Sequence, residues 1–148
     1  MLEITEEEKA YRKEHLAWKD APLHAGDIVW VDMDQLNDRG ALRKMRPAIV
    51  FQNEFTSKMS EVIMIMPITS SPKQIANPFA PNITAELTGS SIEGAIRVNQ
   101  IQTVDKRLVV EREVRGLDYD YVSTLFPDIL RSLKGFIDPT QYHDEDFE

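Results

Sequence analysis

The stretch Gly26-Asp27-Ile28-Val29-Trp30-Val31-Asp32 decides the fold. Its centre is a run of four apolar residues, three of which are β-branched. A short apolar run of this composition predicts a β-strand over residues 27–33 that is buried on both faces.

Other short apolar runs follow it along the chain. Arg46-Pro47-Ala48-Ile49-Val50 contains a strand that starts at Pro47, where a missing N–H is tolerated. Further strands are predicted over residues 61–68, 95–101 and 107–110. Pro67 predicts an edge or a bulge near the end of the first of these. Many short strands followed by one terminal helix predict a mainly β protein with a small, partly open barrel.

Two helices flank the predicted barrel. Thr5 and Glu8 form a capping box that predicts an added N-terminal helix from about Glu6 to Lys19. Asp118 is the expected N-cap of a C-terminal helix, which Pro127 should kink or divide. Its predicted apolar face contains Tyr121, Leu125, Ile129, Leu133 and Phe136.

The net charge of −8 lies at the two ends of the chain. Residues 117–148 carry eight acids against two bases, and residues 1–25 carry six against four. The middle, residues 26–116, carries eleven of each sign and is neutral. Basic residues gather there between Arg39 and Arg46, and such a patch attracts phosphate even in an acidic protein. The simpler interpretation is that these charges only solvate a loop.

Several classes of protein are disfavoured. The chain has no cysteine, so a disulfide framework and a thiolate zinc site are excluded. The three histidines, His15, His24 and His143, have no metal-ligand spacing, and neither a metal nor a cofactor is expected. No apolar run reaches the ~20 residues of a membrane span, and the acidic start lacks a signal-peptide core. We therefore expect a cytoplasmic protein without a membrane partner.

Four sequence blocks occur in a fixed order: Gly26–Asp32, Arg46–Val50, Ile68-Thr69-Ser70, and Gln100 followed by Thr103-Val104-Asp105-Lys106. Together they resemble the MazF/PemK (Kid-like) toxin family of type II toxin–antitoxin systems, over roughly residues 24–135. The resemblance implies an SH3-like, partly open barrel, a homodimer, and an endoribonuclease that a cognate antitoxin neutralises. It also implies metal-independent cleavage of single-stranded RNA, in which the 2′-hydroxyl attacks the adjacent phosphate.

The resemblance also implies the site residues. Arg46 and Arg97 match the family's catalytic cations, and Thr69 matches its catalytic hydroxyl. Substrate binding is expected from Ser70, Asn99, Arg43 and Lys44. Each has a plainer interpretation, because arginines solvate loops and a Thr-Ser pair before Pro72 commonly caps a turn. Gln100, Thr103 and Asp105 match the family but are expected to be structural.

Asn99 is the most important departure from the family. Kid-like members carry aspartate there and MazF-like members often carry glutamate, whereas asparagine cannot act as a general base. Because Arg97 and Asn99 lie two apart on a predicted strand, Asn99→Asp should restore a base beside Arg97 and raise the rate. The alternative is a non-catalytic SH3-like module that binds nucleic acid or an antitoxin. A DNA-binding regulator is disfavoured, since no helix has a basic recognition face.

The expected domain organisation has three parts. Residues 1–23 form the helical extension, and residues 24–139 form the barrel with its C-terminal helix. Residues 140–148 form an acidic tail without fixed structure. The tail either solubilises the protein or competes with RNA or antitoxin for the groove.

Overall fold

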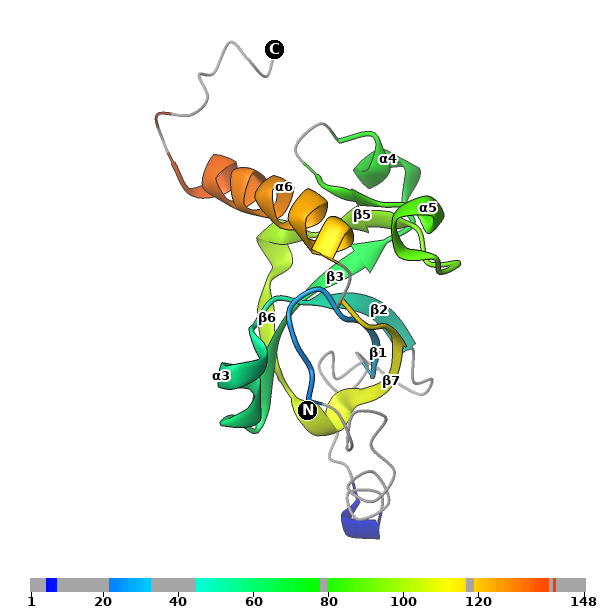
Figure 1. Ribbon diagram of the computed structural model, residues 1–148, viewed down its shortest axis with the longest axis vertical. Coiled ribbons are helices and arrows are strands. Elements are labelled where there is room, and N and C mark those ends of the chain that lie inside the picture. The colour runs from blue at the N-terminus through cyan, green and yellow to red at the C-terminus, as the bar shows by residue number, and fades with distance from the viewer. Residues whose placement is uncertain are drawn as a thin grey trace.

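The computed structural model describes residues 5–7, 22–32, 45–77, 80–116, 119–138 and 140. Figure 1 shows strands that curve around an open barrel, with one long helix beside it. The first half contains β1 (Ile28–Asp32), β2 (Met45–Val50), α3 (Glu54–Lys58), β3 (Val62–Thr69), α4 (Pro72–Ile75) and β4 (Asn82–Ile83). The second half contains α5 (Ala85–Thr88), β5 (Gly94–Ile96), the 3₁₀ helix η1 (Val98–Gln100), β6 (Gln102–Asp105), the 3₁₀ helix η2 (Lys106–Leu108), β7 (Val109–Val114) and α6 (Tyr119–Ile137).

The strands form one antiparallel sheet in the order β4-β5-β3-β2-β1-β7, and β6 also pairs with β3. The predicted fold class is confirmed: the protein is a mainly β, partly open barrel with a C-terminal helix. Of the predicted N-terminal helix, only Glu6 and Glu7 are described as helical, and the rest lies outside the described residues. The acidic tail beyond residue 140 also lies outside them. Among the described helices, none is long and apolar enough to cross a membrane.

Side chains alternate between two apolar cores, one on each face of the sheet. One core fills the barrel, and the other lies between the sheet and α6 (Figure 1). The predicted burial of the first strand on both faces is confirmed, because Val29 belongs to the barrel core and Ile28 to the α6 core. The predicted face of α6 is buried through Tyr121, Leu125 and Ile129, and it becomes exposed towards Phe136.

A buried carboxylate fastens the start of β1 to the end of β7. Asp27 is fully buried, and its two oxygens accept the N–H of Gly116 at 2.8 Å and the N–H of His24 at 3.1 Å. Arg112 lies 3.6 Å away as an ion-pair partner. Burial lowers the pKa of Arg112, and the charge of Asp27 opposes that shift. Gly116 packs directly on Gly26. A Cβ added to Gly116 would lie only 2.4 Å from the carbonyl carbon of Gly26.

Several sequence predictions are wrong in detail. The strand predicted over residues 95–101 ends at Ile96, and a 3₁₀ turn follows it. The strand predicted over residues 107–110 begins only at Val109, and β6 was not predicted. Pro67 lies in the central strand β3, where its carbonyl accepts the N–H of Arg97 at 2.8 Å. Pro127 does not divide α6, which runs unbroken through it.

Candidate functional site

Three neighbouring strands place the predicted catalytic residues on one face of the sheet. Ala48 of β2 is paired with Pro67 of β3, and Thr69 of β3 is paired with Ala95 of β5. Paired residues of antiparallel strands share a face, and so does every second residue along each strand. Arg46, Thr69 and Arg97 therefore point to the same face of the sheet. Elsewhere on the sheet, this face contributes the side chains of the barrel core.

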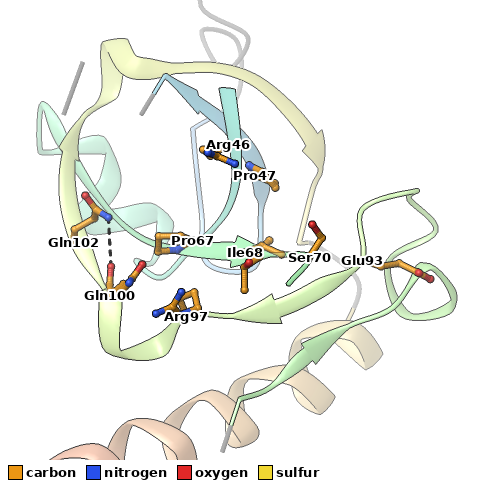
Figure 2. Close-up of a pocket in the computed structure, with 10 residues that line it drawn as sticks. Arg46, Pro47, Pro67, Ile68, Ser70, Glu93, Arg97, Gln100 and Gln102 are labelled. Atoms are coloured by element: carbon orange, nitrogen blue, oxygen red, sulfur yellow. Dashed lines mark hydrogen bonds between the residues drawn. The ribbon is translucent and has the colours of Figure 1, made fainter. Parts of the chain in front are cut away.

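A pocket of about 500 Å³ opens on this face (Figure 2). Its walls combine two arginines, two hydroxyls, two amides, one carboxylate and an apolar floor. The lining residues are Arg46, Pro47, Pro67, Ile68, Thr69, Ser70, Glu93, Arg97, Gln100 and Gln102. The structure thus brings together four of the predicted site residues from separate parts of the chain.

The two arginines make the pocket cationic. Arg46 is exposed and Arg97 is half-buried. Among the described residues, no carboxylate forms an ion pair with either guanidinium. A guanidinium offers a planar fork of donors that matches phosphate oxygens. The pocket is therefore suited to hold a phosphodiester between two positive charges.

Thr69 also has the turn-capping contact that its sequence context suggests. Its Oγ1 accepts the N–H of Ser71 at 3.2 Å, just before α4 begins at Pro72. A threonine oxygen that accepts a hydrogen bond still carries its own O–H donor. Capping and a contact with substrate are therefore compatible at this position.

Asn99 does not share a strand face with Arg97, so that sequence prediction is wrong. Arg97 is the N-cap of η1, and its carbonyl accepts the N–H of Gln100 at 2.9 Å. In a 3₁₀ helix the side chains of residues three apart are eclipsed. Gln100 therefore follows Arg97 onto the pocket side, whereas Asn99 is exposed and outside the pocket lining.

This geometry changes what we expect of Asn99→Asp. A carboxylate outside the pocket lining is poorly placed to accept a substrate proton, so the cleavage rate should change by less than about threefold, well below the 10²–10⁴-fold of a placed base. Single-turnover cleavage of one RNA by the variant and the parent protein measures the change. A rise of a hundredfold would mean that η1 rearranges when substrate binds. Substrate binding by Asn99 itself stays a prediction.

The other sequence candidates lie elsewhere. Arg43 and Lys44 lie outside the described residues. Asp105 accepts the backbone N–H of Arg107 at 2.8 Å and also bonds its side chain, in keeping with the expected structural role. His24 contacts Asp27 in the buried network and does not line the pocket.

Sequence reasoning missed two lining residues, Glu93 and Gln102, and it expected a third, Gln100, to be structural. Neither Glu93 nor Gln102 is one of the residues that define the family blocks. Their position in the sequence, next to strands that contain residues of those blocks, was the one indication that they could line the pocket. Glu93 Oε1 accepts the N–H of Ala85 at 3.0 Å, at the start of α5. Figure 2 shows its carboxylate directed away from Arg97. Within the described part of the chain, no cluster of His, Cys, Asp and Glu has the arrangement of a metal site.

Comparisons with solved structures give the same architecture. MazF from Deinococcus radiodurans matches with a TM-score of 0.58 at 18% identity, covering 79% of this chain and 97% of that one. A MazE–MazF complex from the same organism matches with a TM-score of 0.56 at 19% identity, covering 79% and 96%. An endoribonuclease in complex with its cognate antitoxin, from a mycobacterial species, matches with a TM-score of 0.55 at 15% identity, covering 77% and 92%. No curated protein matches the chain.

The fold and the pocket define a small half-barrel protein with a cationic site at the end of its central strand. The model of the PemK-like, MazF-like toxins of type II toxin–antitoxin systems matches residues 24–132. The chain belongs to this family, and the resemblance read from its sequence blocks is confirmed.

Proposed function

We propose that the protein is an endoribonuclease toxin that cleaves single-stranded RNA without a metal ion or cofactor. The observation that carries this proposal is the pocket, which gathers Arg46, Thr69, Ser70 and Arg97 around a space large enough for a phosphodiester. A shallow pocket of this kind suits RNA whose bases are unstacked.

The proposed reaction is an internal transfer at phosphorus. The substrate's 2′-oxygen forms a bond to the adjacent phosphorus, and the bond from phosphorus to the 5′-oxygen breaks. The 2′-hydroxyl loses its proton and the departing oxygen gains one, so the products are a 2′,3′-cyclic phosphate and a 5′-hydroxyl. Negative charge grows on the phosphoryl oxygens in the transition state, where the guanidinium groups of Arg46 and Arg97 stabilise it. Thr69 and Ser70 are assigned to donate hydrogen bonds to the phosphate or to orient the 2′-hydroxyl.

The site contributes more through charge than through base catalysis. Glu93 is the one carboxylate among the lining residues, and one of its oxygens is already bonded to the N–H of Ala85. The three residues of β5 separate it from Arg97. We therefore expect slower catalysis than at a site where a placed carboxylate accepts the proton of the 2′-hydroxyl.

The partners of the proposed toxin follow from the family. Two of the three structures described above are complexes, one of MazE with MazF and one of an endoribonuclease with its cognate antitoxin. We propose that a cognate antitoxin binds this protein, that the active form is a homodimer, and that it acts in the cytoplasm. Arg43 and Lys44 are proposed to bind the RNA substrate.

Asn99 favours a second candidate function, a binding module without catalysis. Such a module would hold RNA at the same two arginines and leave it intact. Incubation with single-stranded RNA in EDTA discriminates between the two, because the toxin leaves new ends whereas the module only shifts RNA mobility.

A further inference from the structure

We propose that Gly94 is a positioning residue for the cationic pocket: the backbone of β5 at Gly94 fixes the place of Thr69, whose hydroxyl contacts the substrate. This inference rests on the proposed function, because it takes Thr69 as a substrate contact. Gly94 follows Glu93 in the chain and is not itself part of the pocket lining. It acts on the site through its lack of a side chain.

The backbones of β3 and β5 lie directly against each other where Gly94 meets Thr69. A Cβ added to Gly94 would lie 2.3 Å from the carbonyl oxygen of Thr69 and 3.0 Å from its carbonyl carbon. Gly94 also has a φ of 157°, which residues with a side chain rarely adopt. Only glycine allows so close an approach of two backbones, and any side chain here would push the two strands apart.

The contacts of β5 determine which of the two strands would move. Gly94 is paired with Ile83 of β4 on the side away from β3. At the other end of β5, the N–H of Arg97 donates to the carbonyl of Pro67 at 2.8 Å. Thr69, by contrast, is the last residue of β3. A side chain at Gly94 would therefore displace Thr69 and leave Arg97 in its place.

The position of the Thr69 backbone determines where its hydroxyl lies. Thr69 Oγ1 accepts the N–H of Ser71 at 3.2 Å, so the side chain is held against its own turn and follows the backbone. Thr69 and Arg97 both line the pocket, and a phosphate between them needs both groups at the right spacing. A displacement of about 1 Å in a catalytic group can cost about 10²-fold in rate. The contact with Gly94 thus sets the spacing on which the site depends.

The test is a double-mutant cycle of Gly94→Ala and Thr69→Val. For each protein, kcat for cleavage of one single-stranded RNA is calculated for the folded fraction, which near-UV circular dichroism measures. Gly94→Ala should lower kcat by about 10–10²-fold when Thr69 is present. In the Thr69→Val background the same substitution should lower kcat by less than about twofold, because the group that it displaces is already absent.

The matched control is Gly89→Ala. Gly89 also has a positive φ, of 70°, but a Cβ added there would meet no atom within 4 Å. It lies outside the pocket lining, so Gly89→Ala should leave kcat within about twofold. The proposal is overturned if Gly94→Ala costs the same factor with and without the Thr69 hydroxyl, or if Gly89→Ala and Gly94→Ala cost equally.

Two further measurements decide the cases in which the cycle gives no value. If Gly94→Ala does not fold, ¹⁵N relaxation of the parent protein decides: a backbone order parameter of about 0.85 at Thr69 supports the proposal, and a value below about 0.6 overturns it. If the parent cuts no RNA, the proposed nuclease function fails, and the crystal structure of Gly94→Ala decides the positioning role. A change of about 1 Å or more between Thr69 Oγ1 and the Arg97 guanidinium supports it, and an unchanged distance overturns it.

Discussion

We expect Arg46→Ala to lower kcat/KM for RNA cleavage by about 10²–10³-fold. Arg46 lines the pocket and, in the described part of the chain, pairs with no carboxylate, so its charge is available to the phosphate. Removing one preorganised contact to the transition state typically costs ~3 kcal/mol, and each ~1.4 kcal/mol is a factor of ten in rate. Steady-state cleavage of a fluorogenic single-stranded RNA measures the loss.

Two controls give this experiment its meaning. Arg131→Ala removes an arginine that is 76% exposed on α6, pairs with Asp128 and lies outside the pocket lining, so it should leave the rate within about twofold. Arg46→Lys keeps the charge but loses the planar fork, and it should recover only part of the activity. Equal losses for Arg46→Ala and Arg131→Ala would mean that general electrostatics, rather than this pocket, drive cleavage.

The second large effect concerns stability. Asp27→Asn should lower the free energy of unfolding by about 3–5 kcal/mol, because it removes the buried negative charge of the Asp27–Arg112 ion pair. The variant also weakens the acceptor that holds Gly116 and His24, and the Gly116 contact joins the start of β1 to the end of β7. Urea denaturation followed by circular dichroism measures the change.

The matched control for Asp27→Asn is Asp128→Asn. Asp128 forms an exposed ion pair with Arg131 on α6 and should contribute less than about 1 kcal/mol. If the two substitutions destabilise the protein equally, the buried network around Asp27 does not stabilise the contact between β1 and β7 more than an exposed ion pair would.

The strands with continuous apolar runs were predictable, whereas the segment around η1 was not. β1 and β3 contain successive apolar residues that a strand between two cores buries on both faces. Residues 95–101 also alternate between apolar and polar, but Val98 is buried beneath α6 by a 3₁₀ turn. A continued strand and a 3₁₀ turn would both bury Val98. Contact with α6 decides between these two conformations. The prediction that Pro127 divides the C-terminal helix failed because of tertiary packing as well. Leu125 and Ile129 pack in the core on either side of Pro127 and stabilise α6 across it.

The site was predictable where a motif marked it. The family blocks pointed to Arg46, Thr69 and Arg97, and the register of three strands brings them to one pocket. Glu93 reaches the same pocket from the residue before β5, Gln100 from the turn after β5, and Gln102 from the start of β6. Gln100 belongs to a family block, but no local pattern reveals that any of the three lines the pocket. The wrong prediction for Asn99 has the same cause. In a strand the second residue after Arg97 would share its face, whereas in the 3₁₀ turn the third residue does.

The most direct test of the central claim is to incubate the purified protein with a long single-stranded RNA in EDTA and to map the new ends. A second RNA of the same sequence carries a single 2′-deoxy nucleotide on the 5′ side of a mapped cut. We predict cuts at a short defined motif, with 2′,3′-cyclic phosphate and 5′-hydroxyl ends, and no cut at the deoxy position. RNA that stays intact at every protein concentration, cuts that require added magnesium, or cleavage at the deoxy position would contradict the claim.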